Sequence, residues 1–222
     1  MIWGTMGPVS APYRASPYQA SLLDTAAEPS LGPLRQALVR HELGRGAWLD
    51  VLPRWVDGAG ALFEHLHASV PWRADERPMY DRTVAVPRLL AFYGEQQPWP
   101  HPAVERMREQ LSDHYEAELG ERFATAGLCL YRDGRDSVAW HGDRIGRGRS
   151  ADTMVAIVSL GSPRRLLLRP AGGGASRAYA LGSGDLAVMG GTCQRTWEHA
   201  IPKTAKAVGP RISVQLRPRG VL

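Results

Sequence analysis

The segment VAWHGD, residues 138–143, places a histidine and an aspartate two positions apart, at His141 and Asp143. In an extended strand the side chains at positions i and i+2 leave the same face, so both groups can point into one cavity. A third group, His199, lies in the segment TWEHA, residues 196–200, which a second strand can bring alongside. This spacing predicts a metal site made of two imidazoles and one carboxylate.

Three protein ligands on one face of a metal ion leave three coordination positions open. Non-haem Fe(II) oxygenases use this arrangement to hold a cosubstrate and dioxygen together. A His-x-Asp pair is a weak signal by itself, because a chain with seven histidines often contains one by chance. The surrounding segments therefore decide how much weight the pair carries.

A second informative segment is RISVQLR, residues 211–217, in which polar and apolar residues alternate. As a strand it places Arg211, Ser213, Gln215 and Arg217 on one face and three aliphatic residues on the other. A guanidinium can donate two parallel hydrogen bonds to a carboxylate, so two inward arginines suit an acidic cosubstrate. The alternative for Arg217 is a solvated arginine on a surface strand.

The secondary-structure pattern changes along the chain. From residue 123 onward, short β-prone runs alternate with Gly, Pro, Asp and Ser, and this pattern favours an antiparallel sandwich or jelly roll. The expected strands are 125–131, 137–141, 153–159, 164–169, 177–181, 185–189, 196–200 and 211–217. Before them we expect short helices at 34–40 and 58–69, a strand at 48–52, strands joined by turns within 79–94, and a long amphipathic helix at 102–119 that ends at Gly120.

The domain organisation follows from the same pattern. Residues 1–33 are rich in Pro, Ser and Ala and lack periodicity, which predicts a loop-rich or partly disordered N-terminal extension. Residues 34–222 are expected to form a single domain, since a chain of 222 residues is of single-domain size.

The composition bears on the compartment and the partners that we expect for this protein. The two cysteines suggest no disulfide framework, and no stretch approaches the roughly 18 apolar residues of a membrane span, so we expect a soluble cytoplasmic protein. The formal net charge of +5 and the isoelectric point near 9.5 allow attraction to a polyanion such as nucleic acid. Arginine-rich composition also has other origins, so the charge alone does not indicate that partner.

Three segments together resemble the AlkB-type dioxygenases: LYRDGRDSVAWHGD (130–143), MGGTCQRTWEHAIPK (189–203) and 211–217. The resemblance covers roughly residues 79–219, and several separated motifs agree in order and spacing. It implies an α+β fold, a double-stranded β-helix (jelly roll) with its core at about 123–219, flanking N-terminal helices and a nucleotide-recognition lid at about 79–94. It also implies Fe(II), 2-oxoglutarate and dioxygen as cofactor and cosubstrates.

The family pattern carries over position by position. His141, Asp143 and His199 match its iron ligands. The matches to its 2-oxoglutarate residues are Tyr131, Arg211, Ser213 and Arg217, with Arg211 at the distal carboxylate and Arg217 near the end that chelates iron. The residues expected to contact the substrate are Met79, Tyr80, Arg82, Tyr93, Trp140 and Ile145.

Two positions depart from the family pattern. Cys129 stands where the family usually has an asparagine, so one hydrogen bond to 2-oxoglutarate is missing or replaced. Ile145 stands where the family usually has an acidic residue that helps to recognise the amino group of the damaged base. The second departure bears on substrate identity.

The resemblance implies oxidative demethylation of N-alkylated bases, of the 1-methyladenine or 3-methylcytosine type, in DNA or RNA. The N-methyl group is hydroxylated at the expense of 2-oxoglutarate and leaves as formaldehyde. The expected partner is nucleic acid carrying alkylated bases, and the expected state is a monomer. One alternative keeps the cofactor chemistry but changes the substrate to a protein, a lipid or a small molecule. Another is a module that binds damaged nucleic acid without turnover.

Overall fold

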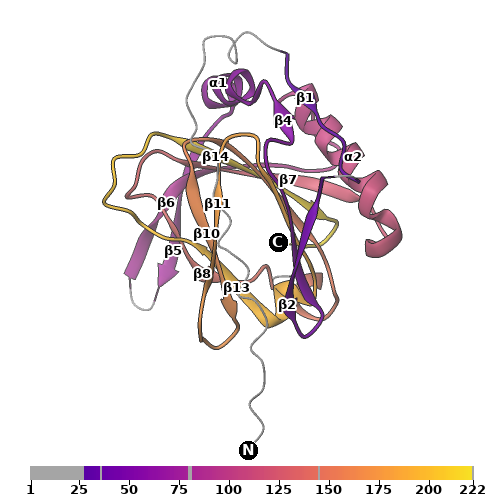
Figure 1. Ribbon diagram of the computed structural model, residues 1–222. Helices are drawn as coiled ribbons and strands as arrows, with labels where there is room; N and C mark the ends of the chain where they lie inside the picture. Colours follow the sequence, from indigo (N-terminus) through magenta and orange to yellow (C-terminus); the bar gives the residue numbers. More distant parts are fainter. Residues whose placement is uncertain (1–27, 36, 80–81, 145, 222) are drawn as a thin grey trace, which may run out of the picture.

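The computed structural model describes residues 28–35, 37–79, 82–144 and 146–221, with the backbone alone at 76–79 and 82–85. Figure 1 shows the arrangement of its helices and strands. The helices are α1 (Ala59–Ser69), α2 (Pro102–Leu119), α3 (Cys193–Thr196) and the short 3₁₀ helix Arg147–Arg149. The strands are β1 (Ser30–Leu31), β2 (Val39–Gly44), β3 (Ala47–Leu52), β4 (Val56–Asp57), β5 (Arg73–Met79), β6 (Arg82–Tyr93), β7 (Phe123–Tyr131), β8 (Val138–His141), β9 (Val155–Gly161), β10 (Arg164–Pro170), β11 (Arg177–Leu181), β12 (Leu186–Gly191), β13 (Trp197–Ile201) and β14 (Arg211–Pro218).

The strands form two main sheets. The larger has the order β2-β3-β12-β9-β14-β7-β6-β5, and the smaller has the order β11-β10-β13-β8. The eight strands expected from residue 123 onward divide evenly between them, with β12, β9, β14 and β7 as neighbours in the larger sheet. This confirms the predicted jelly roll, because successive strands of the chain pass between the two sheets rather than forming one meander.

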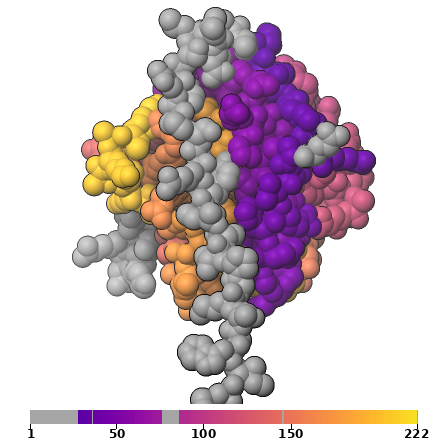
Figure 2. All heavy atoms as spheres, in the orientation of Figure 1, coloured from indigo at the N-terminus to yellow at the C-terminus, as the bar shows by residue number. Residues whose placement is uncertain are grey.

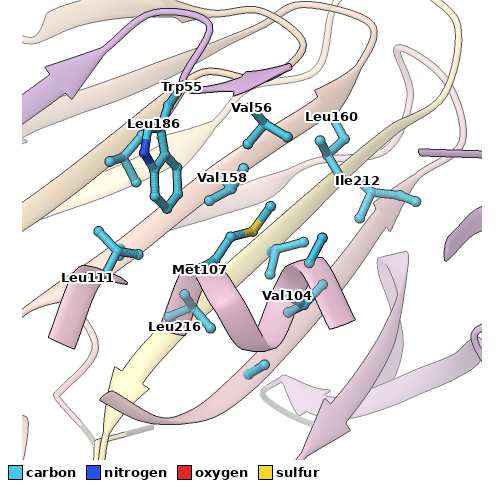
Figure 3. Close-up of a cluster of buried hydrophobic side chains, with 14 of the residues drawn as sticks. Trp55, Val56, Val104, Met107, Leu111, Val158, Leu160, Leu186, Ile212 and Leu216 are labelled. Carbon is cyan, nitrogen blue, oxygen red and sulfur yellow. The ribbon is translucent and has the colours of Figure 1, made fainter. Parts of the chain in front are cut away.

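Helix α2 covers the outer face of the larger sheet. Its apolar residues Val104, Met107 and Leu111 are fully buried, and Figure 3 shows them against strand residues such as Val158 and Leu216. At the N-terminus the helix is capped by His101, whose ring accepts a hydrogen bond from the Ala103 amide, and at the C-terminus by Gly120, whose φ of 76° suits a glycine. The predicted helix at 102–119 is confirmed, as is the helix that starts near residue 58.

Strand β14 separates this outer core from the space between the sheets. Ile212, Val214 and Leu216 belong to the same hydrophobic cluster as α2. The alternate residues, Arg211 and Ser213, line the other face. The predicted alternation is therefore confirmed, and it directs a row of polar side chains into the molecule.

The predicted short helix at 34–40 is wrong. Residues 34 and 38 are joined by a single turn, and Val39 already begins β2, which pairs with β3. Arg40 lies opposite Asp50 across these strands, and its Nε donates to Asp50 Oδ1 at 2.8 Å. The pairing partner outweighs the helical propensity of this segment, a tertiary effect that local sequence does not reveal.

Residues 28–33, the end of the predicted extension, lie against the domain. Strand β1 pairs with β4, and Gly32 O accepts hydrogen bonds from Trp55 Nε1 and Gln110 Nε2. Figure 2 shows the indigo-to-purple N-terminal strands as a continuous surface along one side of the molecule. Within the described residues, no helix has the length and apolar character needed to cross a bilayer.

Candidate metal and cosubstrate site

The three predicted metal ligands converge. His141 on β8 lies directly opposite His199 on β13, with ring centroids 4.2 Å apart. One ligand atom from each of His141, Asp143 and His199 lies within 4.8 Å of the others. Strand β8 ends at His141, so Asp143 reaches the group from the loop after the strand, and the prediction that His141 and Asp143 share one extended strand is wrong.

Neighbouring groups orient these ligands. His141 Nδ1 lies 2.8 Å from Ala139 O, and since a carbonyl only accepts, Nδ1 carries the proton and Nε2 is free to bind a metal. Asp143 Oδ2 accepts a 2.7 Å hydrogen bond from Arg217 Nε, and the Asp143 amide donates to Gln194 Oε1. Asp143 Oδ1 faces His141 Nε2 at 3.7 Å.

The electrostatic environment keeps two of the ligands in the protonation state that a metal needs. Burial lowers the pKa of His199 to about 3, so its imidazole is neutral near pH 7. Burial opposes ionisation of Asp143, but Arg217 and the two histidines outweigh it and lower the pKa of that carboxyl to about 2. Two imidazoles and a carboxylate fit a divalent first-row metal such as Fe(II).

The row of polar residues on β14 begins with a buried arginine. Arg211 is 1% exposed; its Nε donates to Ser159 Oγ at 2.9 Å, and its guanidinium carbon lies 5.2 Å from the Tyr131 ring centroid. Burial raises the pKa of Tyr131 to about 12, so its hydroxyl remains a hydrogen-bond donor. Arg211 Nη1 and Ser213 Oγ are buried and have no hydrogen-bond partner among the described residues.

Unpaired buried donors are costly, and an acidic ligand that accepts from them removes that cost. Arg211 and Ser213 therefore fit one carboxylate of 2-oxoglutarate, while Arg217 lies beside the metal ligand Asp143. The four predicted cosubstrate residues and the three predicted metal ligands all line one cavity. The structure brings these seven residues together as expected.

This cavity has a volume of about 1170 Å³. Besides the polar groups it is lined by apolar side chains from both sheets, Leu90, Ile157, Leu166 and Ile201. Residues 73–75 of β5 and residues 88 and 90–93 of β6 form another part of its wall. The volume exceeds the roughly 300–1,000 Å³ of an ordinary small-molecule pocket, so it has room for more than one ligand.

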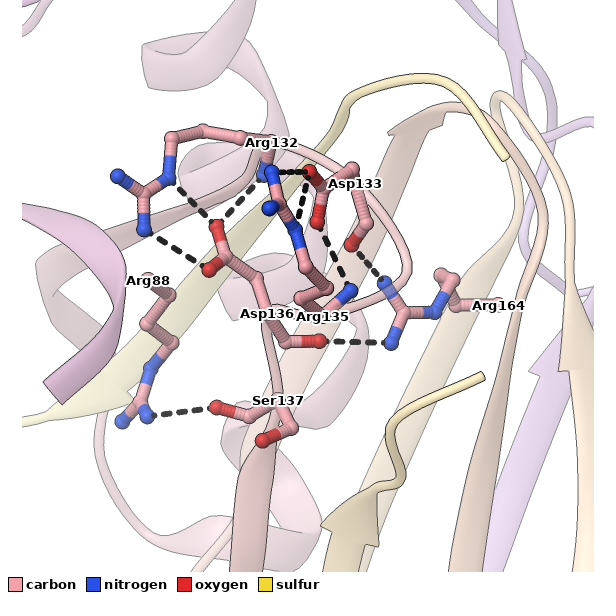
Figure 4. A network of polar contacts seen from close by, with 7 residues as sticks. All are labelled: Arg88, Arg132, Asp133, Arg135, Asp136, Ser137 and Arg164. Carbon is pink, nitrogen blue, oxygen red and sulfur yellow. Dashed lines mark hydrogen bonds and ion pairs between the residues drawn. The ribbon is translucent and has the colours of Figure 1, made fainter. Parts of the chain in front are cut away.

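The loop that follows Tyr131 is fixed by two arginines that the sequence did not single out, as Figure 4 shows. Arg164, which is buried, donates to the carbonyls of Asp133, Asp136 and Pro202 at 2.7–2.9 Å. Arg88 Nη1 donates to Ser137 O at 3.2 Å, and Arg88 also lines the cavity. Nothing in the local pattern around these arginines distinguishes them from solvated ones.

The remaining predicted substrate residues have different outcomes. Tyr93 lines the cavity, as does the neighbouring Phe92, which is 55% exposed. Trp140 does not line the cavity, although Val138 and His141 of the same strand do, because the pairing of β8 with β13 shifts register between these two residues. Arg169 lies 4.3 Å from the Trp140 ring centroid, and contact of Trp140 with the substrate stays a prediction. Met79, Tyr80, Arg82 and Ile145 lie outside the residues whose side chains the structure describes.

Comparison with known proteins agrees with this geometry. The chain is 32% identical over 196 residues to alpha-ketoglutarate-dependent dioxygenase alkB homolog 3 of Bos taurus, covering 76% of this chain and 66% of the relative. It is 26% identical over 213 residues to DNA oxidative demethylase ALKBH2 of Arabidopsis thaliana, covering 79% of this chain and 68% of that protein. The chain thus spans about two thirds of the length of these curated relatives.

Two solved structures share the fold. The structure of OsALKBH1 matches with a TM-score of 0.58 at 14% identity, over 82% of this chain and 100% of that one. A prolyl hydroxylase from Trichoplax adhaerens, in complex with a hypoxia inducible factor peptide fragment, matches with a TM-score of 0.51 at 11% identity, over 71% of this chain and 73% of that one. The AlkB-type resemblance is confirmed by the sequence relatives. Residues 59–217, which carry all seven residues of the site, match the family model, and the chain belongs to the 2OG-Fe(II) oxygenase superfamily.

Proposed function

We propose that this protein is an Fe(II)- and 2-oxoglutarate-dependent dioxygenase that demethylates N-alkylated bases in DNA or RNA. The observation that carries the proposal is the convergence of the His141, Asp143 and His199 ligand atoms beside the unpaired Arg211 Nη1 in one cavity. The names of the relatives support the reaction class, since they include an alpha-ketoglutarate-dependent dioxygenase and a DNA oxidative demethylase.

In this proposal some residues of the site bind 2-oxoglutarate and others orient a metal ligand. Arg211 and Ser213 bind the distal carboxylate of 2-oxoglutarate, and Tyr131 holds the Arg211 guanidinium in place. Arg217 fixes the Asp143 carboxylate, so that one oxygen is left for the metal. Iron, when bound, supplies the oxidative chemistry that hydroxylates the N-methyl carbon, while the apolar lining keeps bulk water from the reacting atoms.

The substrate enters where β5 and β6 line the cavity. We assign the segment 79–94 as the lid that receives the nucleotide, because its described part supplies Tyr93 and the exposed Phe92. A base inside a duplex cannot reach a buried metal, so the enzyme acts on a flipped or single-stranded nucleotide. A base that carries positive charge after methylation of its pairing edge gains cation–π attraction from such aromatic rings.

The test is turnover on defined substrates. Purified protein is incubated with Fe(II), 2-oxoglutarate and oligonucleotides containing 1-methyladenine or 3-methylcytosine, while succinate, formaldehyde and base mass are followed. The Asp143→Ala variant is the inactive control, because it lacks one metal ligand. We expect formaldehyde and the repaired base from the wild-type protein alone.

Two other outcomes correspond to the alternatives. Succinate formation with no change in base mass would assign the same cofactor chemistry to a protein, lipid or small-molecule substrate. Tight oligonucleotide binding without succinate would indicate a binding module. The monomeric state and the cytoplasmic location stay predictions, and sedimentation of the purified protein tests the first.

A further inference from the structure

The predicted 2-oxoglutarate site, formed by Tyr131, Arg211, Ser213 and Arg217, lacks one hydrogen-bond donor that the AlkB-type resemblance implies. Cys129 stands where the family usually has an asparagine, and its side chain lines the cavity. Cys129 pairs with Ser213 across β7 and β14, so both lie in the same part of the predicted 2-oxoglutarate site. A thiol is a weak hydrogen-bond donor, so Cys129 is a poor substitute for the amide of asparagine.

Gln215, on the neighbouring strand β14, places a side-chain amide next to Cys129. It lies two residues beyond Ser213 on the same face of β14, and it lines the cavity. Gln215 Oε1 accepts a 2.6 Å hydrogen bond from Arg217 Nη2, and this contact fixes which end of the amide faces Arg217. Gln215 Nε2 then points toward Cys129, with the sulfur 3.7 Å away.

The contact with Cys129 leaves the Gln215 amide available to a ligand. Sulfur is a weak acceptor, and a hydrogen bond to a charged oxygen is stronger than one between neutral groups. A carboxylate or keto oxygen entering the cavity is therefore the better partner for Gln215 Nε2.

The opposing strand leaves room for this side chain. Gly127 on β7 lies directly opposite Gln215. A Cβ at Gly127 would lie 3.0 Å from Arg217 Nη1 and 3.8 Å from Gln215 Oε1. The absence of a side chain at Gly127 thus accommodates the pair formed by Gln215 and Arg217.

We propose that Gln215 is a positioning residue for 2-oxoglutarate, and that its amide replaces the donor that the family pattern places at residue 129. This inference rests on the proposed function, since it assumes that the cavity binds 2-oxoglutarate. Gln215 Nε2 would donate to the metal-binding end of the cosubstrate, because its amide oxygen is paired with Arg217, which itself contacts the metal ligand Asp143.

The test measures binding without turnover. Mn(II) affinity, and then 2-oxoglutarate affinity in saturating Mn(II), are measured by calorimetry for the wild-type protein and for Gln215→Met, which keeps the length of the side chain but removes the amide. We expect 2-oxoglutarate to bind the variant roughly ten-fold or more weakly, as for loss of a charge-assisted hydrogen bond. Mn(II) affinity should be unchanged. A parallel loss of Mn(II) affinity would overturn the inference, because Gln215 would then act only by holding Arg217.

A double variant tests whether an asparagine at residue 129 can replace the Gln215 amide. In Cys129→Asn/Gln215→Met the asparagine restores the amide of the family pattern, and we expect 2-oxoglutarate affinity to recover. Gln110→Met is the matched control, since Gln110 lies on α2 and bonds to Gly32 O rather than lining the cavity. Equal 2-oxoglutarate affinity of the wild-type and Gln215→Met proteins would refute the role of Gln215 and leave the proposed function intact. Absence of 2-oxoglutarate binding by the wild-type protein would instead refute both.

Discussion

Arg217 Nε lies 2.7 Å from Asp143 Oδ2, and this contact joins β14, an interior strand of the larger sheet, to a metal ligand on the loop after β8. The Asp143 side chain is 5% exposed and that of Arg217 is 13% exposed, so water screens this pair weakly. The contact occupies one carboxylate oxygen and leaves Oδ1 beside His141 Nε2. A residue predicted to contact the cosubstrate thus also orients the metal site.

Arg217→Met should weaken metal binding without unfolding the protein. The substitution leaves Asp143 without its charged partner, and removal of such outer partners of a metal ligand typically costs about 10- to 100-fold in affinity. Calorimetric titration with Mn(II) measures the loss. Arg219→Met is the control, because Arg219 is exposed and pairs with Glu95 at the surface. Equal Mn(II) affinities for Arg217→Met and the wild-type protein would contradict the orienting role.

Arg211→Met should mainly raise the 2-oxoglutarate requirement. It removes a buried charge-assisted contact to a carboxylate, worth roughly 1.5–3 kcal/mol, which corresponds to a rise of about ten-fold or more in the KM for 2-oxoglutarate. Succinate release measured over a range of 2-oxoglutarate concentrations gives this value. The role of Arg211 is disproved if the KM for 2-oxoglutarate stays at the wild-type value.

His199 should make the metal-free protein less stable in mild acid. Its pKa is about 3 in the folded state, below the usual value near 6.5, so the unfolded chain binds the extra proton first. The free energy of unfolding should therefore fall as the pH drops below about 6.5, by at most about 1.4 kcal/mol per pH unit from this group. The carboxyl of Asp143, with its pKa of about 2, does not contribute above pH 5.

Urea unfolding of the metal-free protein at pH 7.5, 6.0 and 5.0 measures this dependence. His199→Gln removes the titrating group, so its free energy of unfolding should fall less steeply over the same range. The variant serves as the internal reference, because it keeps every other ionisable group of the chain. Parallel curves for the two proteins would show that His199 is not buried as a neutral imidazole.

Arg164→Met should destabilise the loop that follows Tyr131. The side chain donates to three backbone carbonyls, one in a buried and two in partly buried hydrogen bonds, and leaving these acceptors unpaired costs roughly 3 kcal/mol in total. The midpoint of urea unfolding measures the effect. The neighbouring Arg165 is exposed on the same strand, so Arg165→Met should unfold like the wild-type protein. Similar unfolding midpoints for the two variants would rule out the anchoring role of Arg164.

The inward face of most strands could be predicted from the alternation of polar and apolar residues. Alternation in 211–217 specified which residues turn inward, because successive side chains of a strand leave opposite faces. Strand β8 departs from this period: Val138 and His141 both line the cavity, because the pairing of β8 with β13 shifts register between them. The eight β-prone runs, separated by turn residues, likewise specified the jelly roll.

The partners that these residues contact depend on how distant segments come together in the folded chain. Val39–Gly44 is a strand because β3 lies beside it, although the preceding residues had suggested a helix. Arg164 is buried and Arg217 is partly buried because carbonyl and carboxylate oxygens from distant segments accept hydrogen bonds from them. Gln215 faces Cys129 because the register between β7 and β14 sets them close together. Local sequence fixes the direction in which a side chain points, whereas pairing register and loop closure determine what it touches.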